Sequence, residues 1–265
     1  MRLANMTWVQ AKEYFDQNDI VLLCIGSTEC HGKHLPLGTD TLIPEKLLEL
    51  IEPKTDVAIA PTLPFGACDT LADFPGTISL GTDTLYEVLT RITQGYRAHG
   101  VRRFAVLNGH GGNNPVLDRV AVDLYRQGCL LAELNWWLMA WDLNPAWKGG
   151  HGGGEETAAI MGIDPTLIRT QYLHDGEEIR NDVSDELPSG SWMDVTFQGG
   201  SVTIPRPVHS ITDNGWLTHG MSIDPPTKAT QAWGEEMLQT MADYLRDFTA
   251  AFERAALPKA QNGEG

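Results

Sequence analysis

Apolar runs alternate with amphipathic segments through the first half of the chain. The apolar runs have the length of buried strands and cover residues 20–25, 57–60, 103–107 and 130–134. Helical spacing of the apolar positions predicts helices over residues 8–17, 42–51, 82–99 and 115–127. Strands that alternate with helices are typical of right-handed crossovers. We therefore expect an α/β fold of three layers, αβα, with a mainly parallel central sheet.

The pattern is less regular in the second half. Four of the eight tryptophans fall within residues 136–147, in a stretch where helical periodicity fails. A helix is expected again over residues 155–161, and a long amphipathic helix over residues 227–254. Residues 175–220 are polar and rich in Gly and Pro, which is consistent with short strands or an intersubunit arm. Because no linker is evident, we expect residues 1–258 to form a single domain and residues 259–265 a flexible tail.

Charge and composition narrow the class of partner. The net charge of −16 argues against nucleic acid and against an anionic membrane surface. No apolar run approaches the ~20 residues of a membrane-spanning helix, and the N-terminus lacks a signal-peptide core. The four cysteines form no CxxC pair, as is usual for reduced thiols. We therefore expect a cytoplasmic protein that acts on a small molecule.

Acidic and imidazole side chains follow two of the predicted strands. Glu29 and His31 come soon after the run 20–25, and His110 follows the run 103–107. The carboxyl ends of parallel strands meet at one edge of a sheet, so these side chains are expected to converge there. Glu29 and His31 point the same way in an extended segment and could bind Zn²⁺ or Mn²⁺. An ordinary hydrogen bond between the two explains the pair equally well.

Further polar positions near these clusters allow more than one interpretation. Asp40 precedes a predicted helix, where it could cap the N-terminus or bridge two cations. The glycine-rich turn around His110 could cradle phosphate, but it lacks the lysine of a P-loop. Glu155 and Glu156 could favour a helix dipole, or form a site together with His151.

Four motifs of the chain resemble a known family in the same order. Residues 26–40, GSTECHGKHLPLGTD, resemble the creatininase-family pattern GSxEQHGxHLPLxTD, with Cys30 in place of the usual glutamine. The segments FPGTISL (74–80), NGHGGN (108–113) and HGGGEET (151–157) resemble the other motifs of the family. The resemblance implies an α/β domain that is commonly assembled as a homo-oligomer, a hexamer. It also implies two divalent ions per chain, Zn and/or Mn, with Fe as a further option.

The resemblance implies a ligand set. One ion is expected to bind to Glu29, Asp40 and His110, and the other to His31, the shared Asp40 and a glutamate. Creatininases proper have that glutamate two residues after the histidine of NGHGGN. This chain has Gly112 at that position, which leaves Glu156 as the best candidate.

The expected reaction is hydrolysis of a carbonyl compound by hydroxide held between the two ions. The substrate is expected to be a small polar amide, cyclic in the first instance, or a formamide. Ring opening of a cyclic diketone derived from a sugar or inositol is an alternative, and so is an inactive metal-binding subunit. His151 resembles the family's proton-transfer histidine, and Glu156 is assigned a catalytic role beside it. The candidate substrate contacts are His34, Asp69, Asp73, Gly111 and Trp137.

The tryptophans of residues 136–147 have two interpretations. They could form an apolar lid that excludes water from the site, or they could pack in the core or in a subunit interface.

Overall fold

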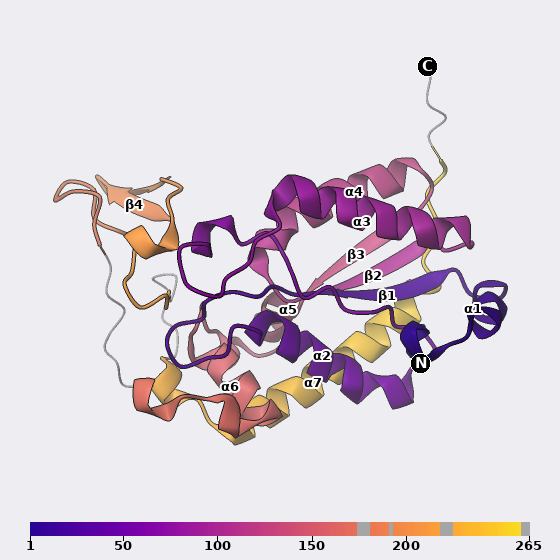
Figure 1. Cartoon of the computed structure of the whole chain (residues 1–265), viewed down its shortest axis with the longest axis horizontal. Coiled ribbons are helices and arrows are strands. Elements are labelled where there is room, and N and C mark those ends of the chain that lie inside the picture. Colours follow the sequence, from indigo (N-terminus) through magenta and orange to yellow (C-terminus); the bar gives the residue numbers. More distant parts are fainter. Residues whose placement is uncertain (174–180, 191–192, 218–224, 261–265) are drawn as a thin grey trace, which may run out of the picture.

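The central sheet has three parallel strands in the order β1-β2-β3 (Figure 1). They are β1 (Ile20–Ile25), β2 (Arg103–Asn108) and β3 (Leu130–Asn135). The structure, a computed structural model, describes residues 1–173, 181–190, 193–217 and 225–260.

The second predicted strand, residues 57–60, is only partly formed. The segment lies alongside β1, where the Leu22 N–H donates to the Ala58 carbonyl and the Ala60 N–H donates to the Leu22 carbonyl, both at 2.9 Å. The pairing is an isolated bridge between Leu22 and Ile59 and does not extend to a ladder. Beyond Pro61 the contact with β1 resumes in a shifted register, where the Leu63 N–H donates to the Cys24 carbonyl at 3.0 Å, so no continuous ladder forms.

Helices cover both faces of the sheet, as Figure 1 shows. Alternate residues of β1 enter two separate cores. Even-numbered residues pack against α2 (Thr39–Ile51) and α7 (Gln231–Phe252), and odd-numbered residues pack against α3 (Gly81–Ala98) and α4 (Asn114–Arg126). The prediction of a three-layer α/β fold is thereby confirmed.

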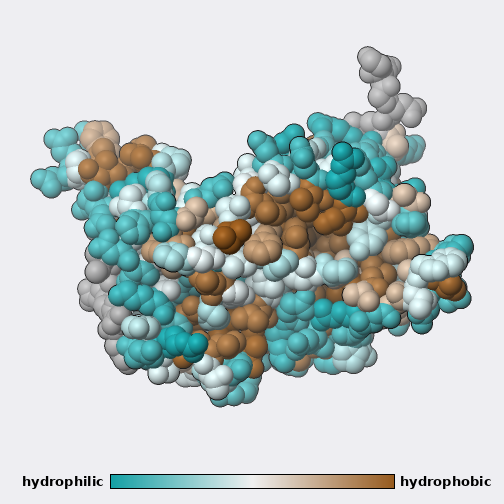
Figure 2. Space-filling view, viewed as in Figure 1, coloured by the Kyte–Doolittle hydropathy of each residue, from teal (hydrophilic) through white to brown (hydrophobic). Residues whose placement is uncertain are grey.

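Two further helices belong to the main body. The helix α1 (Trp8–Phe15) precedes β1, and α6 (Gly154–Ile163) packs against α7. On the face in Figure 2, hydrophilic side chains cover most of the surface and apolar ones gather beside α3. Among the described residues, no helix is both long and apolar enough to cross a membrane.

The helix α5 (Trp136–Leu143) follows β3, in the stretch where no helical periodicity was evident. Its sequence, WWLMAWDL, is apolar on nearly every side. Trp136 and Ala140 are buried in the core, whereas Trp137 and Trp141 lie on a cavity wall. A helix with apolar surroundings on two sides has no polar stripe to reveal its period.

Part of the polar segment 175–220 forms short strands, one of the two interpretations that its sequence allows. The strands β4 (Asp194–Phe197) and β5 (Gly200–Thr203) form an antiparallel hairpin that lies beside the main body in Figure 1. Its turn residues Gln198 and Gly199 both have positive φ, the geometry of a tight hairpin. Residues 175–180, 191–192 and 218–220 of this segment, and 261–265 of the predicted tail, lie outside the described residues.

Candidate metal centre

The loop that follows β1 holds two polar side chains at the edge of the sheet. The Glu29 N–H donates to the Leu37 carbonyl at 2.9 Å, which folds the loop back on itself. The Ser27 hydroxyl donates to Oε2 of Glu29 at 2.8 Å. His31, two residues on, has its Nδ1 atom 3.1 Å from the Glu29 carbonyl oxygen. This hydrogen bond fixes the imidazole ring of His31 so that Nε2 faces the cluster described below.

Glu29, Asp40 and His110 form a first group of ligand atoms. Nδ1 of His110 lies 3.1 Å from Oε1 of Glu29 and 3.1 Å from Oδ2 of Asp40. The opposite ring atom, Nε2, lies 3.1 Å from the Ala67 carbonyl oxygen. A carbonyl can only accept, so Nε2 of His110 donates there and Nδ1 faces the two carboxylates.

His31, Asp40 and Glu156 form a second group. Nε2 of His31 lies 2.9 Å from Oδ1 of Asp40 and 3.7 Å from Oε1 of Glu156. The other carboxylate oxygen of Glu156, Oε2, accepts the Gly152 N–H at 2.7 Å. Within each group the ligand atoms lie within 4.8 Å of one another. The two groups share Asp40, which presents one oxygen to each.

Burial and neighbouring charges shift the pKa values of His31, His110 and Glu156. Burial acts to lower the pKa of His31, but Asp40 and Glu156 outweigh it and raise the pKa to about 10. Burial likewise opposes the effect of Glu29 and Asp40 on His110, whose pKa is raised well above its ordinary value. Burial raises the pKa of Glu156 to about 7, against the influence of His31. Without a metal ion, the negative charge of these buried carboxylates is compensated only by protonated histidines.

The residues present fit a pair of divalent ions. Oε1 of Glu29 and Oδ2 of Asp40 are buried and have no hydrogen-bond partner, although both lie beside Nδ1 of His110. Buried carboxylate oxygens without donors are costly unless a cation compensates them. Carboxylate and imidazole groups are the donor set that Zn, Mn and Fe accept, and each imidazole is anchored through its other nitrogen to a carbonyl.

The interpretation of Asp40 as a helix cap is wrong. Asp40 is the second residue of α2, and the N-cap position is Gly38, which provides no side-chain cap. The Asp40 carboxylate is directed at the two histidines instead. A Cβ at Gly109 would lie 1.9 Å from the Asp40 carbonyl oxygen, so the glycine allows the turn after β2 to contact α2.

The structure gives the phosphate interpretation no support. The turn at residues 108–113 is held by its own asparagines: Asn113 accepts the Ala67 N–H and donates to the Gly26 carbonyl. Carboxylates line the adjacent cavity, and none of the described residues on its wall is Lys or Arg. A phosphate would therefore meet like charge.

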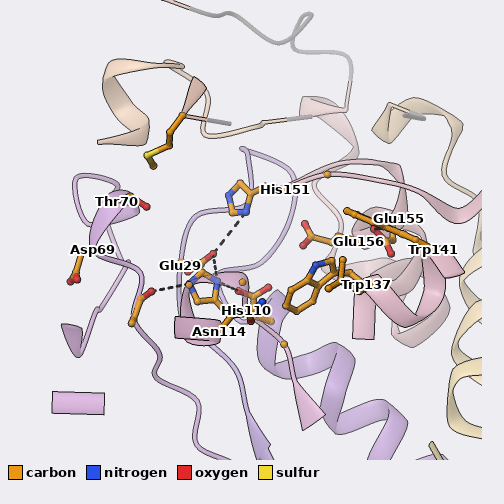
Figure 3. A pocket seen from close by; sticks show the side chains of 18 of the residues that line it. Glu29, Asp69, Thr70, His110, Asn114, Trp137, Trp141, His151, Glu155 and Glu156 are labelled. Atoms are coloured by element: carbon orange, nitrogen blue, oxygen red, sulfur yellow. Dashed lines mark hydrogen bonds and ion pairs between the residues drawn. The ribbon is translucent and has the colours of Figure 1, made fainter. Parts of the chain in front are cut away.

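His151 lies next to the cluster, on the other side of Glu29. Its Nδ1 atom is 3.8 Å from Oε1 of Glu29, and its ring centroid is 4.4 Å from that of His31. The Leu217 N–H donates to the His151 carbonyl at 2.9 Å and holds the backbone in place. Gly152 follows with a φ of 69°, which lets the chain turn from His151 into α6. Figure 3 shows the imidazole above Glu29, among the side chains that line a cavity.

The cavity beside the cluster has a volume of about 570 Å³. Trp137, Trp141, Leu138 and Met193 supply its apolar wall (Figure 3). The predicted substrate contacts Asp69, Gly111 and Trp137 all line it. The other polar wall residues include Glu29, Asp40, His110 and Glu156 of the cluster and the neighbouring His151.

Two predicted substrate contacts lie elsewhere. His34 is not on the cavity wall: it is buried, with Nε2 3.0 Å from the Thr157 hydroxyl of α6. Burial lowers the pKa of His34 to about 4, so the ring is neutral and acts as a packing group between the loop and α6. Asp73 is exposed and also lies off the wall.

The tryptophan-rich stretch divides between the two interpretations. Trp136 and Trp147 are buried in the core, and Trp137 and Trp141 line the cavity. Neighbouring positions of a helix differ in direction by about 100°, so adjacent tryptophans such as Trp136 and Trp137 can face the core and the cavity. The sequence alone does not show which one faces which.

Several wall residues had no signal in the sequence. Met193 precedes β4 and reaches the cavity from a part of the chain without recognisable periodicity. Thr70 and Thr82 flank a loop whose course only the fold reveals. For Glu155 the sequence allows either an acid at a helix start or a member of a site with His151. In the structure Glu155 is a buried residue of the cavity wall, and burial raises its pKa well above the ordinary value.

Gly112 has no space for a side chain. A Cβ there would lie 2.2 Å from the Ala67 carbonyl oxygen and 2.4 Å from Nε2 of His110. No side chain fits at this position without displacing His110. Glu156 reaches the same cluster from the first turn of α6.

Comparisons with known proteins find similar chains along most of the sequence. A family model described as creatininase, creatinine amidohydrolase, matches residues 4–249. The mycofactocin precursor peptide peptidase of Mycobacterium tuberculosis is 30% identical over 84% of this chain and 81% of its own length. The 3-dehydro-scyllo-inosose hydrolase of Thermotoga maritima is 24% identical over 97% of this chain and 86% of its own.

A solved structure described as "Creatininase Mn" superimposes with a TM-score of 0.72. It covers 96% of this chain and 99% of its own, at 22% identity. The fold, the motifs and the family model therefore lead to one conclusion: the chain belongs to the creatininase family of amidohydrolases.

Proposed function

We propose that the chain is a two-metal hydrolase that cleaves an amide bond in a small polar substrate. The observation on which this rests is the pair of ligand groups that share Asp40. In the proposal, Glu29, Asp40 and His110 hold one divalent ion, and His31, Asp40 and Glu156 hold the other. The relative named for manganese and the donor set favour Mn or Zn.

The surrounding residues have the positions that hydrolysis requires. Two divalent ions in the cluster would polarise a substrate carbonyl and lower the pKa of a water molecule toward neutrality. His151, on the cavity wall and 3.8 Å from Glu29, moves a proton to the leaving nitrogen. The backbone at Gly111 also lines the cavity, where an N–H can stabilise a developing oxyanion. Trp137 and Trp141 exclude water from this wall.

A ketone substrate is the second candidate. The Thermotoga maritima relative, named for an inosose, aligns with 97% of this chain. Attack on the carbonyl of a cyclic diketone needs the same cluster, and it would break a C–C bond instead of a C–N bond.

The test combines metal analysis with a substrate panel. Chelator-treated protein is reloaded with Zn²⁺, Mn²⁺ or Fe²⁺ and offered lactams, formamides, short peptides and cyclic diketones. We expect about two ions per chain and turnover of an amide class. The His151→Ala variant should keep both ions and lose turnover.

Three outcomes would contradict parts of this proposal. Fewer than one ion per chain would refute the two-metal site. Turnover of cyclic diketones alone would favour the second candidate, and two bound ions without turnover of any class would indicate an inactive metal-binding subunit.

A further inference from the structure

The second group of ligand atoms draws on two segments that are distant in sequence. His31 lies in the loop after β1, and Glu156 lies in the first turn of α6. The distance of 3.7 Å between their facing atoms therefore depends on how the loop packs against α6. His34 lies in the same loop as His31, and Thr157 directly follows Glu156. A contact between His34 and Thr157 thus joins the two segments beside their ligands.

The contact between His34 and Thr157 is a hydrogen bond with a defined direction. Both side chains are buried, and Nε2 of His34 lies 3.0 Å from the hydroxyl oxygen of Thr157. The Thr157 hydroxyl donates its one proton to the Gly153 carbonyl at 2.6 Å. Its oxygen can then only accept, so the imidazole of His34 holds its proton on Nε2 and donates it. Loss of either partner would leave a buried polar group unsatisfied.

The hydrogen bonds continue from Thr157 to the carboxylate of Glu156. The Gly153 carbonyl accepts both the hydroxyl and the N–H of Thr157, which fixes the start of α6. The preceding residue, Gly152, donates its N–H to Oε2 of Glu156 at 2.7 Å. A Cβ at Gly152 would lie 3.2 Å from the carbonyl carbon of His31, so this turn packs closely against the loop. With Oε2 held in this way, Oε1 of Glu156 faces His31.

The first group of ligand atoms does not depend on α6. Glu29, Asp40 and His110 come from the loop after β1, from α2 and from the turn after β2. The backbone carbonyl that anchors the His110 ring also lies outside α6. A change in the contact between His34 and Thr157 should therefore affect the two ion sites unequally.

We propose that His34, through its hydrogen bond to Thr157, is a positioning residue for the second ion. The hydrogen bond holds α6 against the loop after β1, so that His31 and Glu156 can bind the same ion. Residues that anchor metal ligands in this indirect way typically change metal affinity by about 10–100-fold when they are removed. This inference rests on the proposed function, because it assumes one ion in each ligand group.

The test measures metal affinity and does not depend on turnover. Metal-free protein is titrated with Zn²⁺ in competition with a chromophoric chelator, which resolves the affinities for the two ions. His34→Leu removes the donor, and Thr157→Val removes the hydroxyl at nearly constant shape. Each should weaken the binding of one ion about 10–100-fold and leave the other within about threefold.

Conservative variants should rescue the second ion. His34→Gln keeps an N–H donor near the position of Nε2, and Thr157→Ser keeps the hydroxyl. Both should bind the second ion within about threefold of the wild type. In a Glu156→Gln background, His34→Leu should change the affinity for the remaining ion by less than about threefold, because both substitutions act on the same site.

Thr93→Val is the matched control. Thr93 is a buried residue of α3, and its hydroxyl donates to the carbonyl of Leu89, four residues earlier, at 2.9 Å. The Thr157 hydroxyl has the same relation to the Gly153 carbonyl. Thr93→Val therefore removes a buried hydroxyl in the same helical geometry, away from the metal cluster. It should leave both affinities within about twofold of the wild type.

Two outcomes would overturn this inference. One is unchanged affinity for both ions in His34→Leu and Thr157→Val, and Thr157→Val alone decides if His34→Leu fails to fold. The other is equal weakening of both ions, or no rescue by His34→Gln and Thr157→Ser, since either indicates a general structural role. Fewer than one ion per chain in the wild type would instead contradict the proposed function.

Discussion

Nε2 of His31 lies 2.9 Å from Oδ1 of Asp40, and both side chains are almost completely shielded from solvent. The opposite ring atom of His31 is held by a backbone carbonyl. Nε2 must therefore hold either a proton or a metal ion in order to face the carboxylate. This exclusive choice links metal binding to pH.

Metal binding should release protons at pH 8. The pKa of His31 is about 10 in the metal-free protein, so its ring is protonated at this pH, and the pKa of His110 is shifted in the same direction by Glu29 and Asp40. An ion takes the nitrogen lone pair, and the proton must leave. We expect at least about one proton per chain, from His31, when both ions bind, measured by calorimetry in buffers of different ionisation enthalpy. No release at pH 8 would contradict the assignment of the two histidines as ligands.

The stability of the metal-free protein should fall as the pH rises. The pKa of His31 is raised from 6.5 to about 10 on folding. A raised pKa gives a stabilisation that is fully present below pH 6.5 and disappears as the pH passes 10. Urea unfolding of the metal-free protein should therefore show a loss on the order of 3 kcal/mol between pH 7 and pH 10. The His31→Gln variant is the control, and an equally steep loss in that variant would show that other groups are responsible.

Substitutions in the cluster should remove different numbers of ions. Asp40 belongs to both ligand groups, whereas Glu156 belongs to one and His110 to the other. We expect Asp40→Asn to leave less than about one ion per chain, and Glu156→Gln or His110→Ala to leave about one. Elemental analysis of the purified variants measures this directly. If Asp40→Asn retained both ions, the shared role of Asp40 would be excluded.

Gly112→Ala should disturb the orientation of His110. The new methyl group would lie 2.2 Å from the Ala67 carbonyl oxygen and 2.4 Å from Nε2 of His110, so it competes with the hydrogen bond between them. We expect the variant to lose one ion and about 1–3 kcal/mol of stability.

Gly111→Ala is the neighbouring control for that experiment. A Cβ there meets only the Trp137 ring, at an ordinary 3.7 Å. Metal content and melting temperature of this variant should stay near those of the wild type. Equal metal content in the two variants would show that the position of Gly112 has no effect on His110.

The sequence was informative where burial is uniform or motifs follow strands. All six residues of β1 are buried, and its apolar run was recognised with the same bounds. Parallel strands end at one edge, so residues as distant in sequence as Glu29 and His110 could be expected to meet, and their facing atoms lie 3.1 Å apart.

The sequence does not predict the role of a side chain where that role depends on which way the side chain points. Glu155 and Glu156 are the same residue type in the same helical turn, and only the packing of α6 separates a wall acid from a cluster acid. Met193 lines the cavity, but its segment shows no hydrophobic periodicity from which this position could be predicted. His34 lies within a strong motif but faces α6 instead of the cavity. Such directions depend on tertiary contacts, which local patterns do not encode.

The neighbouring residues Trp136 and Trp137 offer a test of this dependence on direction. Trp136 is 1% exposed and packs in the core below α5, whereas Trp137 is half-buried on the cavity wall. Truncation of a buried aromatic side chain removes its transfer free energy and leaves a cavity. We expect Trp136→Ala to cost about 3–5 kcal/mol in urea unfolding of the metal-saturated protein. Trp137→Ala should cost less than about 1.5 kcal/mol and should weaken ligand binding in the cavity instead, because the wall already faces open space. Similar losses of stability in the two variants would show that Trp137 is part of the core and that the wall proposed for the substrate is misplaced.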